Sequence, residues 1–212
     1  MKIIQRLSED GYIRVGNYTV DTDLLGPGIR FVLWLQGCNA DCYGCIAPEM
    51  QDVKGGSLFS IEKLAEMIIS SKNAEGITIS GGEPLLQADR LCQLLKIVKT
   101  ARPDYSVVIY TGFTIDQALT CENNEVSRLI NELADVVIDG RYVDEQNDNK
   151  GLRGSSNQRI IHITDRYKEH PAYDVNRKRQ SRFITNAGRM YMVGVPSRAM
   201  QTLLGKIKNK AK

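Results

Sequence analysis

Residues 30–45 read "RFVLWLQGCNADCYGC", an apolar run followed at once by three cysteines. The run at 30–37 is short, continuous and apolar, as a buried strand is. Cys38, Cys42 and Cys45 then fall within eight residues. A disulfide uses two cysteines and a closed structural zinc site uses four ligands. Three thiols at the end of a strand therefore indicate a metal site of another kind.

Apolar runs alternate with helical patterns on both sides of this stretch. We expect strands at 30–37, 76–80, 105–112, 135–140 and 159–164, and helices at 60–72, 87–101 and 124–134. Strand–helix–strand units in series predict an α/β fold with a parallel sheet covered by helices. Right-handed crossovers coil such a sheet into an open sheet or a partial barrel of about five to six strands.

The pattern changes after residue 165. Residues 166–181 are polar and irregular, residues 182–196 resemble a β-hairpin around Asn186, Ala187 and Gly188, and the last residues resemble a helix capped by Ser197. We therefore expect a main domain at 1–165 and a C-terminal extension at 166–212 packed on that domain.

Composition limits the class of protein. The chain has 212 residues, of which 42% are hydrophobic and 25% charged, as in soluble globular domains. It has no apolar run of about 20 residues and no signal-peptide pattern, so a cytoplasmic protein without membrane contact is the default expectation. The net charge of +3 is mild, and the basic excess lies in the last forty residues. Such a tail is more often a solvated surface than a contact for nucleic acid or for an acidic partner.

The five cysteines do not suggest a disulfide framework, because their number is odd. Zinc would need a fourth ligand beside the clustered cysteines, and the other candidates have no paired spacing: Cys92, Cys121, His162 and His170. Iron–sulfur clusters are normally held by four cysteines. Three cysteines on a four-iron cluster leave one iron open to a small molecule, and Gly37 and Gly44 allow the loop to turn tightly around it.

Other distinctive segments follow the later strands. They are "SGGEP" (80–84), "TGF" (111–113) and "DGRYV" (139–143). Chemistry in parallel α/β folds lies at the C-terminal ends of the strands, so these segments are expected to meet the cysteines at one edge. Gly81 and Gly82 permit close backbone approach, and Glu83 adds a carboxylate. The plain alternative for this segment is a strand-to-helix turn.

The spacing Cys-x-x-x-Cys-x-x-Cys is the defining motif of radical S-adenosylmethionine enzymes, and this chain resembles them. A "GGEP" after the next strand matches the glycine-rich motif of that family. Three further stretches are similar to the activating proteins of anaerobic (class III) ribonucleotide reductases. These are "GPGIRFVLWLQGC" (26–38), "IDGRYV" (138–143) and "LRGSSNQRIIHI" (152–163). The similarity runs from about residue 17 to 165.

This resemblance implies a partial barrel of the radical S-adenosylmethionine type and two cofactors, a 4Fe-4S cluster and S-adenosyl-L-methionine. The metal ligands would be Cys38, Cys42 and Cys45, and no catalytic residues are expected beyond them. The residues expected to contact S-adenosyl-L-methionine are Gly81, Gly82, Glu83, Tyr110, Thr111, Asp139, Arg153, Ser155 and Asn157.

Several of these assignments have alternatives. Asp139 ends a strand, where its carboxylate can accept hydrogen bonds from ribose hydroxyls. Residues 153–158 hold either the nucleoside or a peptide backbone of the partner, or they form only a hydrogen-bonded loop. Tyr110 lines the adenosyl pocket or belongs to the core. The chain also departs from the family, because Gly44 stands where many members have an aromatic residue, and residues 166–212 have no counterpart in the shortest activating proteins.

The resemblance implies an oxidoreductase that generates a glycyl radical on a partner, the large subunit of anaerobic ribonucleotide reductase. It also implies a low-potential electron donor such as flavodoxin. A second hypothesis keeps the chemistry but directs it at a small molecule or a peptide of a biosynthetic pathway. A third, a zinc-stabilised nucleic-acid-binding module, leaves "SGGEP" and "RGSSNQ" unexplained.

Overall fold

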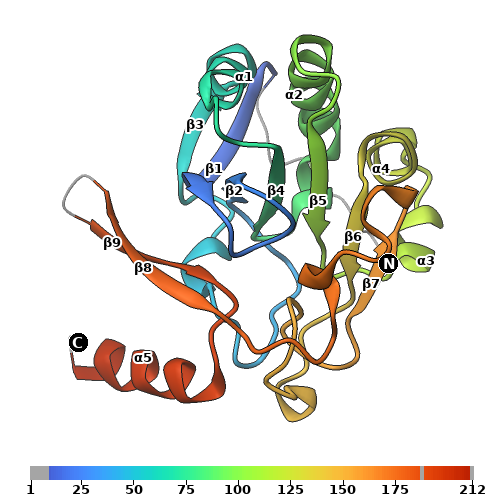
Figure 1. Ribbon diagram of the computed structural model, residues 1–212. Coiled ribbons are helices and arrows are strands. Elements are labelled where there is room, and N and C mark those ends of the chain that lie inside the picture. The colour runs from blue at the N-terminus through green and yellow to red at the C-terminus, as the bar shows by residue number, and fades with distance from the viewer. Residues whose placement is uncertain (1–9, 187–188, 211–212) are drawn as a thin grey trace.

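The computed structural model describes residues 10–186 and 189–210 and is built around one seven-stranded sheet (Figure 1). The strand order is β3-β1-β2-β4-β5-β6-β7. The strands of this sheet are β1 (Tyr12–Thr22), β2 (Arg30–Leu35), β3 (Ser57–Ser60), β4 (Gly76–Gly81), β5 (Ser106–Tyr110), β6 (Val136–Asp139) and β7 (Arg159–His162). The helices are α1 (Ile61–Ser70), α2 (Ala88–Ala101), α3 (Ile115–Leu119), α4 (Asn124–Arg128) and α5 (Arg198–Lys210), and a separate hairpin is formed by β8 (Ser181–Asn186) and β9 (Arg189–Gly194).

The centre of the sheet is parallel. Strands β2, β4, β5 and β6 pair side by side in the same direction, with Leu33 opposite Ile79 and Ile79 opposite Ile109. These apolar strands are buried on both faces, as parallel strands between two covering layers must be. The chain therefore has a mixed α/β fold with a mostly parallel sheet, and the C-terminal ends of the four parallel strands lie at one edge.

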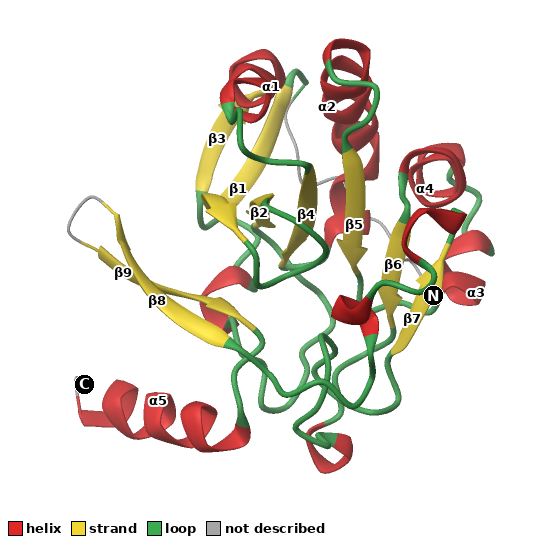
Figure 2. Ribbon diagram, in the orientation of Figure 1, coloured by secondary structure: helices red, strands yellow, loops and turns green. Residues whose placement is uncertain are grey.

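One face of the sheet packs on α1, α2 and α4 (Figure 2). Alternate residues of each strand point to this side, such as Phe31 and Leu33 of β2. Helix α1 turns an apolar stripe toward them, with Leu64 and Ile68 fully buried. Ser60 caps the N-terminus of this helix, because its hydroxyl accepts a hydrogen bond from the Lys63 amide at 3.3 Å.

The expectation of five to six parallel strands is wrong in one respect. The strand expected at 159–164 forms as β7, but it pairs antiparallel with β6, Asp139 lying opposite Arg159. Residues 140–158 contain no crossover helix, so the chain turns back at the C-terminal end of β6. Strands β1 and β3 were not expected at all, and both are antiparallel additions on the side of the sheet opposite β7.

The helix expected at 124–134 is divided. It begins as α4 with its N-terminus capped by Asn123, whose side chain accepts from the Glu125 amide at 2.9 Å. It then continues as a π-helical turn from Leu129 to Leu133. The apolar residues Leu129 and Ile130 remain buried, so the change of helix type keeps this segment packed on the sheet.

The second face of the sheet is covered by the C-terminal segment. Ala172 and Tyr173 pack on Val108 of β5, and Val193 of the hairpin packs on Val32 of β2. The hairpin lies below β1 and β2, and α5 lies beyond it (Figure 1). The expected hairpin and terminal helix are therefore both present. The Ser197 hydroxyl caps α5 by accepting from the Met200 amide at 3.3 Å, while the expected turn residues Ala187 and Gly188 lie outside the described part of the chain.

In the described part of the chain, no helix combines the length and the apolarity that crossing a membrane requires.

Candidate metal centre

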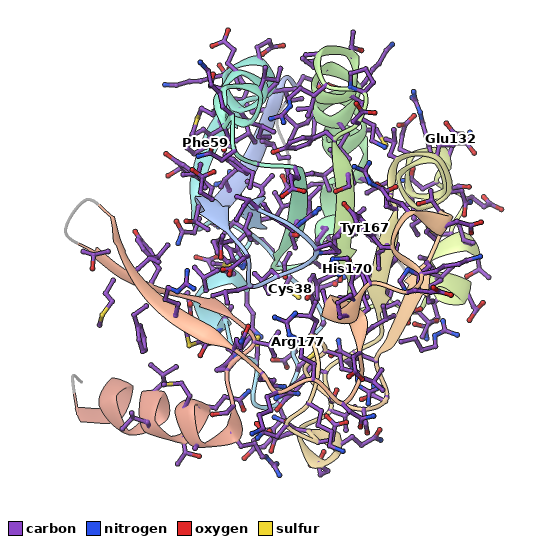
Figure 3. All side chains as sticks on the ribbon, viewed as in Figure 1. Cys38, Phe59, Glu132, Tyr167, His170 and Arg177 are labelled. Carbon is purple, nitrogen blue, oxygen red and sulfur yellow. The ribbon has the colours of Figure 1, made fainter. Side chains whose placement is uncertain are left out.

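A cavity of about 220 Å³ opens at the C-terminal edge of the parallel strands. It is lined by the three clustered cysteines and by residues that follow each of the other parallel strands. Cys38 lies near the middle of the molecule, between the sheet and the C-terminal segment (Figure 3). The lining residues include Cys38, Cys42, Cys45, Ser80, Gly81, Gly82, Glu83, Tyr110, Thr111, Gly112, Gly140, Tyr142, Gly154, Gln158, Gly194, Val195 and Gln201.

The cysteine loop is fixed by hydrogen bonds between its two ends. The Gly37 amide donates to the Met50 carbonyl at 2.9 Å, and the Cys38 amide donates to the Gln51 carbonyl at 3.1 Å. The buried amide of Gln36 donates to the Asp52 carbonyl at 2.8 Å. Gly37 has a φ of 98°, a left-handed conformation that glycine adopts without strain. The chain therefore turns sharply after β2, and residues 50–52 return to lie beside residues 36–38.

The three thiols are half-buried and carry no disulfide. The Ala40 amide donates to the sulfur of Cys38 at 3.4 Å, a contact that suits a thiolate. Burial raises the pKa of the Cys38 thiol to about 11. An unligated thiol there would keep its proton at neutral pH, and a bound metal cation would displace that proton.

An iron–sulfur cluster fits these residues better than a single zinc ion does. Within the described residues, no three His, Cys, Asp or Glu side chains converge on one point where they could hold a single ion. None of the four candidates for a fourth zinc ligand lines the cavity: Cys92, Cys121, His162 and His170. An iron–sulfur cluster takes its cysteines on different iron atoms, so its thiolates need not meet at one point.

Gly81 and Gly82 bring the end of β4 against the cysteine loop. The Gly82 amide donates to the Leu35 carbonyl at 2.7 Å, and the Glu83 amide donates to the Gly37 carbonyl at 2.8 Å. A Cβ atom on Gly82 would collide with the Gly37 carbonyl, and one on Gly81 would lie 2.5 Å from the Leu35 backbone. Both glycines are therefore needed for contact between backbones.

Glu83 joins the ends of two strands. Its carboxylate accepts hydrogen bonds from the Leu85 amide at 3.0 Å, the Thr111 hydroxyl at 2.8 Å and the Gly112 amide at 2.8 Å. The side chain is almost completely buried, and this burial raises the pKa of Glu83 to about 6 despite the three donors. The carboxylate thus fixes the segment after β5 against the segment after β4.

Comparison with known proteins places the chain in a family. Residues 24–161 match the model of a 4Fe-4S single cluster domain. This chain belongs to the 4Fe-4S single-cluster family. It is similar to the anaerobic ribonucleoside-triphosphate reductase-activating proteins of Enterobacteria phage T4 (31% identity, 68% of this chain and 91% of the relative) and of Escherichia coli K12 (32%, 69% and 96%). It is also similar to the pyruvate formate-lyase-activating enzyme of Listeria monocytogenes (30%, 70% and 61%).

These matches confirm the resemblance to radical S-adenosylmethionine activating enzymes that the motifs indicated. The family match includes the cysteine loop, residues 80–84 and the loop at 139–158. It ends at residue 161, so β8, β9 and α5 lie beyond it.

Tyr110 and Thr111 line the cavity, as expected for cofactor contacts. The Tyr110 hydroxyl donates to the Leu152 carbonyl at 3.0 Å, and burial raises the pKa of Tyr110. The Tyr110 ring also packs against both clusters of buried side chains on this face. The side chain therefore belongs to the core and to the cavity wall at once.

Four expected cofactor residues do not line the cavity: Asp139, Arg153, Ser155 and Asn157. They are engaged within the protein. Arg153 donates to Asp148 at 2.9 Å, the Ser155 hydroxyl accepts from the Val143 amide at 3.1 Å, and Asn157 donates to the Arg141 carbonyl at 2.8 Å. Their neighbours Gly140, Gly154 and Gln158 line the cavity instead. A cofactor contact by any of these four side chains stays a prediction.

Asp139 offers a direct test of that prediction. Its fully buried carboxylate accepts from Arg159 at 3.0 and 2.5 Å and from the Ile115 amide at 2.7 Å. We expect Asp139→Asn to lower the free energy of unfolding by about 1–3 kcal/mol, because the substitution removes the buried negative charge that pairs with Arg159. Chemical denaturation of the anaerobic protein measures this change.

Asp116→Asn is the matched control, because Asp116 bonds the same guanidinium at 3.1 Å but its side chain is 81% exposed. It should change stability little. If Asp139→Asn left stability unchanged and weakened only S-adenosylmethionine binding, Asp139 would be a cofactor contact rather than a structural group.

Arg179, in the C-terminal extension, is a site-supporting residue that sequence reasoning missed. Its side chain is only 1% exposed. The guanidinium donates to the carbonyls of Arg153 and Gly154, both at 2.7 Å, and to Asn147 at 2.8 Å. No spacing or motif marked this arginine among the basic residues around it. It holds the loop that carries "RGSSNQ".

We expect Arg179→Ala to lower the free energy of unfolding by about 2–4 kcal/mol, because two half-buried carbonyls lose a charged donor. Arg177→Ala is the control, since Arg177 donates at 2.8 Å only to the exposed side chain of Gln180. Denaturant titrations of the two variants provide the measurement. Equal losses for both variants would contradict the role given to Arg179.

Tyr142 is a second residue that the sequence assignments did not include. It lines the cavity, and a Cβ atom on Gly44 would lie 3.4 Å from its ring. Its hydroxyl donates to Asp144 at 2.6 Å and accepts from Asn147 at 3.1 Å. An aromatic ring thus lies beside the position where the cysteine motif itself has glycine. The aromatic residue in "DGRYV", a segment that follows a strand, was the sequence feature that could have indicated this role for Tyr142.

Proposed function

We propose that this chain is a radical S-adenosylmethionine enzyme that generates a glycyl radical on a partner such as anaerobic ribonucleoside-triphosphate reductase. The observation that carries the proposal is the cavity at the C-terminal ends of the parallel strands, which the three clustered cysteines line together with Gly81, Gly82 and Glu83. The names of the similar proteins support the choice of partner.

In this proposal Cys38, Cys42 and Cys45 hold a 4Fe-4S cluster, and S-adenosyl-L-methionine occupies the rest of the cavity. Such a cluster, once reduced, would supply the one electron that reductive cleavage of the sulfonium into methionine and a 5′-deoxyadenosyl radical requires. The backbone at Gly81 and Gly82 lies beside the cysteine loop, and this position supports a contact with the amino-acid part of the cofactor. Tyr110, Thr111 and Tyr142 line the remaining wall.

The protein's task is to exclude water and to position the cofactor beside the hydrogen donor. The donor is a glycine Cα–H of the partner, whose hydrogen atom becomes part of 5′-deoxyadenosine. The electron comes from a low-potential donor such as flavodoxin. The proposal includes a partial barrel at residues 1–165, an extension at residues 166–212 and a cytoplasmic location.

A second candidate has one specific observation in its favour. Gly194, Val195 and Gln201 of the extension line the cavity, so the extension narrows the side from which a macromolecule would approach. A small molecule or a peptide of a biosynthetic pathway would suit such a narrowed site. This candidate keeps the same cluster and cofactor.

One experiment separates the two candidates. The reconstituted protein is incubated without oxygen with S-adenosylmethionine, a reductant and the anaerobic reductase of the same organism. Electron paramagnetic resonance should then show a glycyl radical on the reductase. Cleavage of S-adenosylmethionine without a glycyl radical would favour the second candidate, and the absence of both would contradict the radical chemistry itself.

A further inference from the structure

The charges of the chain are strongly segregated. Residues 175–212 contain ten Lys and Arg and no Asp or Glu, so their net charge is +10. The other 174 residues contain 18 Lys and Arg against 25 Asp and Glu, so their net charge is −7. This basic part includes β8, β9 and α5, which lie beyond the family match. A surface of one sign attracts a partner of the opposite sign.

The hairpin has two different faces. Val193 is 1% exposed, and with Ile184 it packs toward the sheet. The register pairs Phe183 with Met192 and Thr185 with Met190, which places these residues on the opposite face. On that outer face Phe183 is 43% and Met190 70% exposed. The hairpin therefore carries large apolar side chains that nothing in the described structure covers.

Helix α5 adds a second exposed element next to the hairpin. It is anchored at its first turn, where the Arg198 amide donates to Asn149 at 2.9 Å and Arg198 forms an ion pair with Asp144 at 3.3 Å. Beyond this anchor the helix runs below the hairpin in the view of Figure 1, and Leu203 is 52% exposed. The outer face of the hairpin and α5 together form what we call the basic appendage, defined as residues 181–186 and 189–210.

The basic appendage borders the cavity. Gly194 and Val195, at the end of the hairpin, and Gln201, in α5, are all lining residues. A macromolecule seated on the outer face of the appendage would therefore lie next to the opening that leads to the cysteines. Position and charge thus point to the same occupant, namely the macromolecule on which the site acts.

We propose that the basic appendage is the docking surface for an acidic patch on the glycyl-radical partner, close to the loop that carries its glycine. This inference rests on the proposed function. Exposed Phe, Met and Leu in a segment of basic sequence suit a protein interface, in which apolar contacts form the centre and charges form the rim. A nucleic-acid duplex would use the cations through its phosphates, and Met190 and Leu203 would gain nothing from it.

The test uses two variants of the full-length holoprotein. The charge variant is Lys206→Glu, Lys208→Glu and Lys210→Glu, all in α5, and its matched control is Lys63→Glu, Lys72→Glu and Lys96→Glu, on or next to α1 and α2. The apolar variant is Phe183→Ser with Met190→Ser. Its control is Ile97→Ser, which removes an exposed apolar side chain from α2.

Binding to the purified reductase is measured directly, at low and at high salt. Each appendage variant should raise the Kd about tenfold or more, and the controls should raise it less than about twofold. Added salt should weaken binding of the unsubstituted protein more than binding of the charge variant. Iron content and cleavage of S-adenosylmethionine by a chemical reductant without partner should stay unchanged in all of them.

Three results would overturn the proposal. The appendage variants could bind the reductase as the controls do. They could lose only the binding of a DNA duplex, which would identify a nucleic-acid surface, or lose only self-association in sedimentation, which would identify a contact between copies. Failure of the proposed function is distinguishable, because the reductase would then bind normally through the appendage and yet acquire no glycyl radical.

Discussion

Replacing Cys38, Cys42 or Cys45 by alanine is expected to abolish the iron–sulfur cluster in each single variant. Only these three cysteines line the cavity, and a cluster already short of one protein ligand has no substitute close by. Iron and acid-labile sulfide should fall to background after anaerobic reconstitution, and no 5′-deoxyadenosine should form. Iron analysis and the visible absorption of the cluster provide the measurement.

Cys92→Ala and Cys121→Ala are the matched controls. The Cys92 thiol is buried in α2 and donates to the Glu125 carbonyl at 3.3 Å, and the Cys121 thiol donates to the Ala118 carbonyl at 2.7 Å. Both variants should keep a full cluster, with a loss of stability on the order of 1 kcal/mol. A cluster lost in either control, or kept in any of the three ligand variants, would show that the ligands are assigned wrongly.

Gly82→Ala is expected to have the second large effect, although it removes no functional group. The added methyl group would collide with the Gly37 carbonyl and would lie 2.9 Å from the Met50 carbonyl. Both atoms belong to backbone that holds the cysteine loop, so the loop must shift. We expect a loss of about 1–3 kcal/mol in the free energy of unfolding and a decrease of about a hundredfold in S-adenosylmethionine cleavage.

Ser80→Ala provides the control for this prediction. Ser80 lines the same cavity two residues earlier, and its replacement by alanine adds no atom. Denaturant titrations and 5′-deoxyadenosine yields should distinguish the two variants clearly. A Gly82→Ala protein with normal stability and normal cleavage would mean that the close backbone contact of β4 with the cysteine loop is not required.

The parallel centre of the fold was predictable because its strands are local apolar runs. Residues 30–37, 76–80, 105–112 and 135–140 each show a buried strand without reference to the rest of the chain. The direction of β7 was not predictable from its own residues, because "RIIHIT" has the same apolar character in either direction. What decides it is the absence of a crossover helix in residues 140–158.

The same distinction holds for the candidate site. Cys38, Gly82 and Glu83 were found because their spacing after strands carries information. The position of Asp139 at a strand end suggested a ligand contact, but the partner that engages its carboxylate, Arg159, lies twenty residues away on β7. Arg179 was missed for the same reason, because only the folded chain brings it to residues 153 and 154.

The central claim is that the three cysteines hold a cluster that cleaves S-adenosylmethionine, and one measurement tests it most directly. The protein is purified without oxygen, reconstituted with iron and sulfide, reduced, and given S-adenosylmethionine. We predict about four irons per chain together with 5′-deoxyadenosine and methionine in equal amounts. A colourless protein that holds zinc, or an intact reduced cluster that forms no 5′-deoxyadenosine, would contradict the account.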